Sequence, residues 1–392
     1  ALRVDDGSAK GHTGPIWAAK FSHDGTLLCS GGACGRLFVW GVSLSAGGEQ
    51  VRLDDGPKMV FKGHDGELLD LSISSDNLIL TSGTDTYVRL WHPLSGECLG
   101  EFSHPHIATS VLFLPTNQQL FLTGCLDGKV RLYDLKPPGG GPPQVVSETD
   151  TRGCVTAVAV SNDSLTVVAG LFEGKCMVFE LDAERRRIVQ GGKSIVSIKS
   201  SRGKNAKGHK ITGLQYSGGG KKHDLEARLL VMTLDSRVRM YRVADMNLIC
   251  KYKGHLNKGS ITDGRHDTST QIKASFSPCI NFVASGSEDG SLYIWSRTPS
   301  RSTALFASLR KDRNTAPYRL PMGPHPPPPT PAGSAPDRPP SAHGKLSSKD
   351  AVFLSPTAVA FSNLVELNSR GEGASEGGVA LCAVVGLFNG DL

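Results

Sequence analysis

An acidic residue is followed six positions later by an aromatic residue at several places along this chain. The clearest copy spans residues 284–295 and reads Ala-Ser-Gly-Ser-Glu-Asp-Gly-Ser-Leu-Tyr-Ile-Trp. Its Asp289-Gly290 pair favours a tight turn between two strands, because both residues tolerate positive φ. The pairs are Asp85 with Trp91, Asp127 with Tyr133, Glu173 with Phe179, Asp235 with Tyr241 and Asp289 with Trp295, and Cys34 stands in the acidic position before Trp40. A strand–turn–strand unit repeated in this way predicts an all-β repeat fold.

Histidines define the length of each unit. A His precedes the aromatic residue by 28, 27, 29, 32 and 40 residues in five units, and a fourth strand brings the period to roughly 40–45 residues. These units resemble WD40 repeats, which form the four-stranded blades of a β-propeller. The resemblance implies one all-β, seven-bladed propeller over residues 1–392, with its last blade incomplete. We expect blades near residues 11–57, 58–100, 101–150, 151–200, 201–250, 251–310 and 350–392, a disordered proline-rich insert at 314–342, and a closing strand at 2–4.

The resemblance also implies a structural role for the repeated polar residues. In WD40 repeats a His, a Ser or Thr, an Asp and a Trp form a hydrogen-bonded chain, and each link satisfies the next. The matching residues are His12, Ser30 and Trp40; His64, Thr81, Asp85 and Trp91; His104, Thr123, Asp127 and Tyr133; His209, Asp235 and Tyr241; and His255, Ser285, Asp289 and Trp295. These sets recur in unit after unit and lack a nucleophile elbow, so we interpret them as structural tetrads and not as hydrolase triads.

Composition argues against several classes of function. The net charge of +6 is spread along 392 residues, so no nucleic-acid partner is expected. None of the nine cysteines forms a Cys-x-x-Cys pair, so a zinc site is not expected. Scattered thiols of this kind indicate a cytosolic or nuclear protein. The N-terminus has no signal core, and the apolar run at 379–388 is too short to span a bilayer. We expect a protein that is not an enzyme, has no cofactor and is a fragment of a longer chain.

Binding residues are expected where the copies differ. Residues before each turn acid, and residues that begin each first strand, should face the same opening of the propeller. The candidate partner-binding face consists of Trp17, Leu69, Leu126, Phe172 and Glu288. For Trp17 and Leu69, packing between blades explains the apolar side chain equally well.

Two inserts offer further candidate contacts. Residues 185–210 are basic, and their alternatives are a solvated loop or contact with anionic lipid head groups through Lys199, Arg202, Lys204 and Lys207. The proline-rich insert is either a disordered loop or a ligand for an SH3 or WW domain.

Five stretches carry a closer resemblance: 88–92, 126–132, 200–213, 271–277 and 310–314. They are similar to a subfamily of Rab-effector WD40 proteins of recycling endosomes, and Ser-Ser-Arg-Gly-Lys-Asn-Ala-Lys-Gly-His-Lys-Ile-Thr-Gly at 200–213 is the most specific of them. The resemblance implies a cytoplasmic protein-interaction scaffold, peripheral on endosomal or Golgi membranes, that meets a Rab GTPase through a segment outside this chain. The alternative is a peptide-binding substrate receptor or nuclear scaffold. An enzyme would need carboxylates or metal ligands converging on the central channel.

Overall fold

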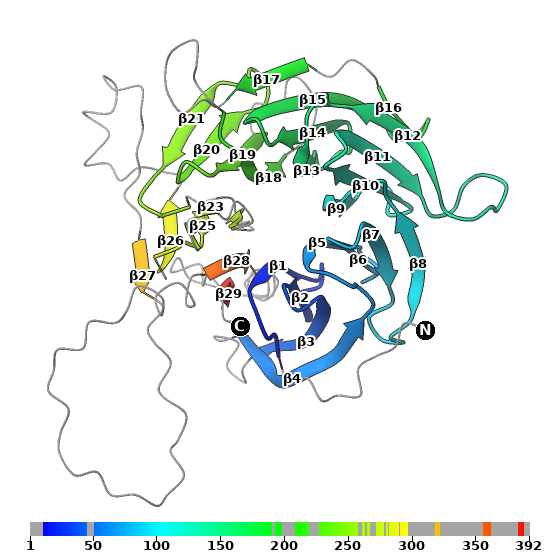
Figure 1. Cartoon of the computed structure of the whole chain (residues 1–392), viewed down its shortest axis with the longest axis horizontal. Helices are drawn as coiled ribbons and strands as arrows, with labels where there is room; N and C mark the ends of the chain where they lie inside the picture. Colours follow the sequence, from blue (N-terminus) through cyan, green and yellow to red (C-terminus); the bar gives the residue numbers. More distant parts are fainter. Residues whose placement is uncertain are drawn as a thin grey trace, which may run out of the picture.

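The computed structural model describes residues 11–44, 51–189, 193–197, 208–218 and 227–257, followed by 261–262, 265–266, 272–277, 280, 282–289, 291–296, 318–321, 356–361 and 383–387. Every regular element in these ranges is a β-strand. No helix within them is long and apolar enough to cross a bilayer. Figure 1 shows the sheets arranged in a ring, with first strands such as β1, β5, β9 and β13 toward the middle.

Six sheets of four or five strands form blades 1 to 6. Blades 1 to 3 comprise β1 (Ile16–Phe21), β2 (Leu27–Gly32), β3 (Arg36–Leu44) and β4 (Val51–Lys62); β5 (Leu68–Ile73), β6 (Ile79–Gly83), β7 (Tyr87–Trp91) and β8 (Cys98–Ser103); and β9 (Ala108–Phe113), β10 (Leu120–Cys125), β11 (Lys129–Asp134) and β12 (Gln144–Asp150). Blades 4 to 6 comprise β13 (Val155–Val160), β14 (Thr166–Leu171), β15 (Lys175–Asp182), β16 (Arg187–Ile188) and β17 (Lys193–Ser197); β18 (Ile211–Ser217), β19 (Arg228–Thr233), β20 (Arg237–Arg242) and β21 (Leu248–Tyr252); and β24 (Ala274–Phe276), β25 (Phe282–Ser285), β26 (Ser291–Ser296) and β27 (Tyr318–Pro321). Within each blade the strands pair antiparallel.

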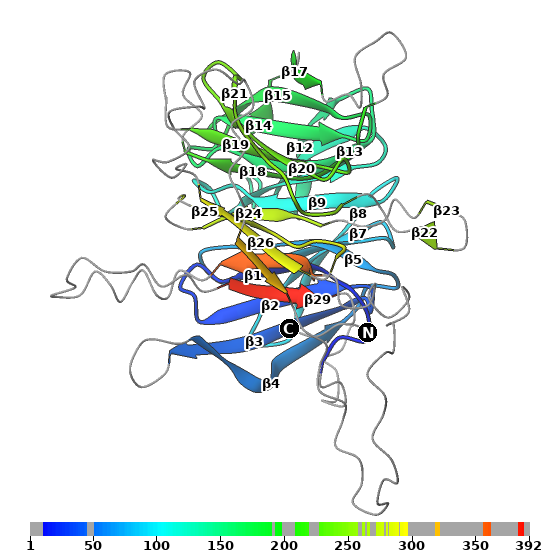
Figure 2. The same ribbon diagram turned by 90° about the vertical axis from the view of Figure 1, so that its left-hand side faces the viewer.

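A two-stranded sheet lies where the ring closes. It pairs β28 (Pro356–Phe361) with β29 (Ala383–Leu387), and β28 contacts both β1 and β24. Figures 1 and 2 agree in placing β28 (orange) beside β1. A separate small hairpin joins β22 (Ile261–Thr262) to β23 (Arg265–His266). The all-β propeller is therefore confirmed, the count of seven blades stays a prediction, and residues 2–4 lie outside the described residues.

The aromatic residue of the repeat joins neighbouring blades. Trp91 of β7 packs against Phe61 of β4 with ring centroids 5.3 Å apart, so the blade 2 aromatic reaches the outer strand of blade 1. The cluster around them also holds Leu37 from blade 1 and Leu71 from blade 2. Since apolar side chains from both sheets are removed from water together, the interface between blades serves as the core of the ring.

The outer strands depart from the expected boundaries. β4 continues to Lys62, so blade 1 extends beyond its expected end near residue 57. β16 and β17 both pair with β15, which makes part of the basic segment sheet. β27 pairs with β26, so blade 6 takes its outer strand from the expected proline-rich insert. An edge strand bonds on one side only and tolerates Gly, Pro and charged residues, so its sequence lacks the apolar pattern of the inner strands.

Candidate functional site

Two kinds of connection meet at one end of the propeller. The turn between the second and third strands of a blade lies beside the segment that enters its first strand, and a backbone hydrogen bond joins the two. It recurs from Ala33 N–H to the Pro15 carbonyl (2.8 Å), Thr84 to Glu67 (2.9 Å), Leu126 to Ile107 (3.0 Å), Phe172 to Cys154 (2.9 Å) and Leu234 to Lys210 (3.1 Å). We call this end the turn face. The expectation that both sets of positions share one opening is thus met by the geometry in five blades.

An apolar arc runs over blades 3 to 5 of the turn face. Phe172 is 46% exposed, and Ile107, Leu126 and Leu234 are half-buried at equivalent positions of the neighbouring blades. Ile107 and Leu234 were missed by the sequence reasoning, although they occupy positions equivalent to Cys154 and Phe172. Alignment of the repeats by their turn acids would have found Leu234. Glu288, the candidate from blade 6, is half-buried, and its N–H donates to the carbonyl of Leu256 (2.9 Å).

Trp17 and Leu69 do not belong to this exposed surface. Trp17 is 4% exposed and Leu69 is 8% exposed. The indole N–H of Trp17 donates to Glu67 Oε2 at 2.8 Å, which links blade 1 to blade 2. The first strands line the inner wall of the ring, where a large side chain has neighbours on several sides. Their assignment to the partner-binding face is therefore corrected to packing between blades.

Blade 2 closes its tetrad completely. His64 Nδ1 lies 2.9 Å from Asp85 Oδ1, and His64 Nε2 lies 2.8 Å from Thr81 Oγ1. Arg89 Nη1, which only donates, lies 2.7 Å from the same Nδ1, so the direction of the bonds at His64 depends on the tautomer of its ring. The Trp91 indole N–H donates to the Thr81 hydroxyl oxygen at 2.8 Å. Thr81 is therefore the link on which both rings depend.

Blade 1 builds the same chain with a thiol in place of the carboxylate. His12 Nε2 lies 2.8 Å from Ser30 Oγ, which accepts the Trp40 indole N–H at 2.9 Å. Cys34 Sγ lies 3.1 Å from His12 Nδ1. Burial lowers the pKa of His12 to about 3, so the ring is neutral at physiological pH.

In blades 3 and 5 the turn aspartates form ion pairs with arginines of the third strand. Arg131 forms an ion pair with Asp127, and Arg239 forms one with Asp235. In both pairs the aspartate lies four residues before the arginine. Arg89 pairs with Asp85 in the same way at 2.6 Å. The sequence reasoning missed these three buried arginines, although the repeated spacing Asp-x-x-Val-Arg indicates them.

The histidines of blades 3 and 5 lie apart from the turn acids. His104 instead contacts the Phe102 carbonyl at 3.1 Å, Thr123 Oγ1 at 3.0 Å and the Tyr133 hydroxyl at 3.2 Å. In blade 5, Asp235 also accepts from Thr233, His209 is half-buried ahead of β18, and Tyr241 is buried.

Blade 6 departs furthest from the expected tetrad. The Trp295 indole N–H donates to the Lys253 carbonyl at 3.1 Å, and the Ser285 hydroxyl donates to the Gly286 carbonyl at 3.0 Å. Asp289 accepts from the Tyr293 hydroxyl at 2.6 Å. Within the described part of the chain, His255 Nδ1 is buried without a hydrogen-bond partner. Blade 6 keeps all four residues of the pattern, as blade 2 does, but they do not form the same hydrogen-bonded chain.

This difference predicts unequal effects of removing the two hydroxyls. Thr81→Val should destabilise the fold by about 2–4 kcal/mol, because two buried ring nitrogens lose their partner. Ser285→Ala should destabilise it by about 1 kcal/mol, because it removes one bond to a backbone carbonyl. Urea unfolding of the two variants measures the difference, and equal losses would contradict the assignment of Thr81 as a shared link.

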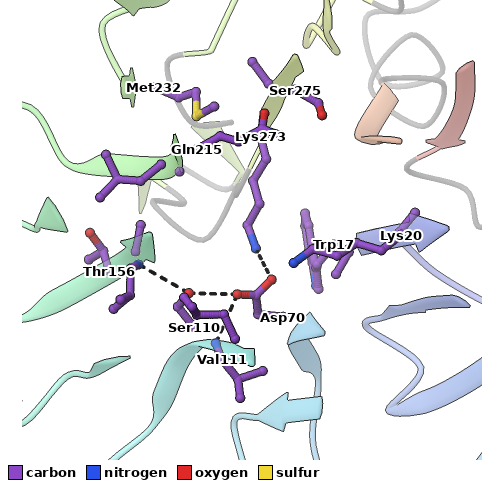
Figure 3. A pocket seen from close by; sticks show the side chains of 18 of the residues that line it. Trp17, Lys20, Asp70, Ser110, Val111, Thr156, Gln215, Met232, Lys273 and Ser275 are labelled. Carbon is purple, nitrogen blue, oxygen red and sulfur yellow. Dashed lines mark hydrogen bonds and ion pairs between the residues drawn. The ribbon is translucent and has the colours of Figure 1, made fainter. Parts of the chain in front are cut away.

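A cavity of about 290 Å³ occupies the central channel. Its lining includes residues from the first strands of several blades, and Asp70 is its only carboxylate among the described residues. Lys273 Nζ lies 2.8 Å from Asp70 Oδ1, although 203 residues separate the two in sequence. The Ser110 hydroxyl and the Val111 N–H donate to Asp70 Oδ2 at 2.8 and 3.2 Å. Figure 3 shows these groups, with Lys20, around one space.

The charges in this cavity shift one another's pKa. Burial by itself would raise the pKa of Asp70, but Lys273, Lys20 and the hydrogen bond from Ser110 together lower it. Burial lowers the pKa of Lys20. The negative charge of Asp70 raises that pKa, whereas the positive charge of Lys273 lowers it further. Asp70 is therefore ionised at neutral pH and holds the wall of blade 2 to that of blade 6.

The described residues contain no group of three or more His, Cys, Asp or Glu side chains placed to hold a metal ion. The lipid-contact candidates Lys199, Arg202, Lys204 and Lys207 lie outside the described residues. Of the arginines before them, Arg185 pairs with Asp182 at 3.7 Å and Arg186 pairs with the buried Asp134. Those two arginines are therefore engaged within the fold.

Comparison with known proteins agrees with this architecture. The family model of the WD domain, G-beta repeat, matches residues 7–41, 56–92, 96–134 and 246–296. The chain belongs to the WD40-repeat family. The matches cover blades 1, 2, 3 and 6, whereas blades 4 and 5, with a degenerate and a partial tetrad, are recognised through the fold. The matched family is defined by a structural repeat and not by a catalytic residue set.

Individual WD40 proteins are similar to most of the chain. WD repeat-containing protein 44 of Xenopus laevis is 32% identical over 352 residues, which cover 77% of this chain and 35% of that protein. An uncharacterised WD repeat-containing protein of Schizosaccharomyces pombe is 26% identical, over 71% of this chain and 47% of its own length. The 2-deoxy-glucose resistant protein 2 of Saccharomyces cerevisiae is 28% identical, over 66% of this chain and 29% of its own length. The chain thus spans less than half the length of these relatives.

Proposed function

We propose that this chain is a non-enzymatic scaffold that binds partner proteins on its turn face and acts in Rab-dependent endosomal or vesicle trafficking. The binding face is inferred from the apolar arc. In this arc Phe172 is exposed on blade 4, and Leu126 and Leu234 occupy the equivalent positions of the two neighbouring blades. Aromatic side chains in such surroundings supply much of the binding energy at protein interfaces. The β-sheet blades beneath hold them in place, so little ordering is required on binding.

The trafficking role rests on the resemblance to Rab-effector WD40 proteins. From it we infer a cytoplasmic protein, peripheral on endosomal or Golgi membranes, with the Rab contact in a segment outside this chain. The propeller would then hold a second partner while the Rab GTPase recruits the whole protein. The two contacts are separable because they lie on different parts of the polypeptide.

A quantitative pull-down tests both contacts. A version extended at its N-terminus should capture GTP-loaded Rab, and this chain alone should not. Phe172→Ser should leave Rab capture unchanged but weaken capture of the propeller's partners at least tenfold, or about 1.4 kcal/mol. Leu94→Ser is the matched control, because Leu94 is 74% exposed in the turn after β7, at the opposite end of blade 2. Equal effects of the two substitutions would refute the turn face, and absence of Rab capture by the extended version would refute the trafficking role.

Two peripheral contacts remain part of the proposal. The basic segment that includes Lys199 and Arg202 would meet anionic head groups, and liposome flotation that is unchanged after neutralising Lys199, Arg202, Lys204 and Lys207 would rule this out. The proline-rich insert would dock to an SH3 or WW domain through the part that follows β27. Titration of such a domain with a peptide of residues 322–342 tests that contact directly.

A further inference from the structure

The channel wall is built in layers that can be read from strand register. One layer contains Ala18, Asp70, Ser110, Ala157 and Gly213, each of which pairs with the residue after the hydroxyl position of the tetrad on the second strand, and Lys273, which directly precedes β24. The layer two residues further along these strands contains Lys20, Ser72, Leu112, Ala159, Gln215 and Ser275. Lys20 and Gln215 therefore face the channel at the same depth, from blades 1 and 5.

Several polar side chains in these layers accept hydrogen bonds from backbone N–H groups of a neighbouring blade. The first strand of each blade is an inner edge, so half of its N–H groups lack a partner within the sheet. Ser72 accepts from Phe113 N–H at 3.1 Å, and Gln215 Oε1 accepts from Phe276 N–H at 2.7 Å. A lysine ammonium has no lone pair, so Lys20 cannot accept a hydrogen bond from a backbone N–H group.

The cavity also has an excess of positive charge. Two lysines, Lys20 and Lys273, face a single carboxylate, and that carboxylate is already engaged by Lys273, Ser110 and Val111. Within the part of the chain that the structure describes, Lys20 forms no ion pair or hydrogen bond, and the amide nitrogen of Gln215 is not used. The Lys20 side chain is exposed to the solvent of the channel, so its ammonium is accessible to an anion that enters.

We propose that the channel binds a small oxyanion, a phosphate or carboxylate group, between the Lys20 ammonium and the Gln215 amide. Both groups donate hydrogen bonds, and the ammonium supplies the charge. The cavity of about 290 Å³ has room for such a group together with water. The oxyanion is either a free ion or the acidic side chain of a partner's loop that enters the channel. Figure 3 shows both residues bordering this space.

The test measures binding by isothermal titration calorimetry, and thermal unfolding, with two probes. Sodium phosphate is compared with sodium chloride at matched ionic strength, and a short blocked peptide with one glutamate is compared with its glutamine version. Wild type should bind at least one probe with millimolar or better affinity and unfold at a higher temperature. Stronger binding of phosphate indicates a free ion, whereas stronger binding of the glutamate peptide indicates a partner's loop.

Two variants separate this site from non-specific charge. Lys20→Gln should lose binding at least tenfold, whereas Lys175→Gln, which removes an exposed lysine on β15, should bind as wild type does. Gln215→Glu should also abolish binding while it keeps an acceptor for Phe276 N–H, because its carboxylate occupies the place of the anion. Binding that persists in both channel variants, or the absence of binding of either probe to wild type, overturns the proposal. The turn-face function does not depend on this result.

Discussion

Lowering the pH from 7.5 to 5 should reduce the free energy of unfolding by about 6 kcal/mol, through three buried histidines at about 2 kcal/mol each. Burial lowers the pKa of His12 to about 3, and those of His104 and His255 to about 4. In the unfolded chain a histidine titrates near 6.5. Between these values the unfolded state binds protons that the folded state excludes, so stability is fully present above pH 6.5 and is lost as the pH falls.

Between pH 7.5 and 5, the change in stability comes from the histidines and not from the carboxylates. Asp70, Asp127 and Asp235 have a lowered pKa in the fold, so their stabilisation is lost only below the ordinary carboxylate range, near pH 4. Urea unfolding at pH 7.5, 6.5, 5.5 and 5 therefore reports on the histidines. His104→Gln should remove about one third of the pH-dependent loss, and His23→Gln, at an exposed histidine, should remove none. An identical pH dependence in both variants would contradict the prediction.

Removal of the Asp70 carboxylate should be the most damaging single change in the channel. Asp70→Leu should lower the free energy of unfolding by about 3–5 kcal/mol, because it leaves the partly buried Lys273 ammonium without its counter-charge. It also deprives the Ser110 hydroxyl and the Val111 N–H of their acceptor. Lys273→Met should cost less, about 1–2 kcal/mol, because Ser110, Val111 and the nearby Lys20 still stabilise the carboxylate.

A double-substitution cycle distinguishes this charge pair from simple packing. Asp70→Asn keeps an acceptor for Ser110 and Val111 but leaves both lysines charged, and Lys273→Met then removes one of them. The combined variant should be more stable than the sum of the single losses predicts, by at least about 1 kcal/mol. Chemical denaturation of the four proteins measures this coupling, and additive losses would show that the two side chains do not stabilise one another.

The fold was predictable because its information is local. β1 and β5 lie in the first two expected blades, and each is a mostly buried, mainly apolar run that ends before a turn. The outer strand β27 was missed, and β4 extends past the expected end of blade 1, because an edge strand needs only backbone pairing on one side. The candidate partner-binding face stays a prediction. Phe172 is exposed as expected, but Trp17 is buried, because its burial depends on how closely blade 2 approaches blade 1.

The segment 284–295 shows where the sequence stops being sufficient. Its spacing alone determined a strand, a turn and a second strand that contains Trp295, because turn chemistry and strand alternation act over a few residues. Only the tertiary structure decided that Trp295 bonds the Lys253 carbonyl and that Asp70 meets Lys273 across the channel. Such pairings arise when the closing ring brings distant strands to the same depth, and no local pattern records which strands will face one another.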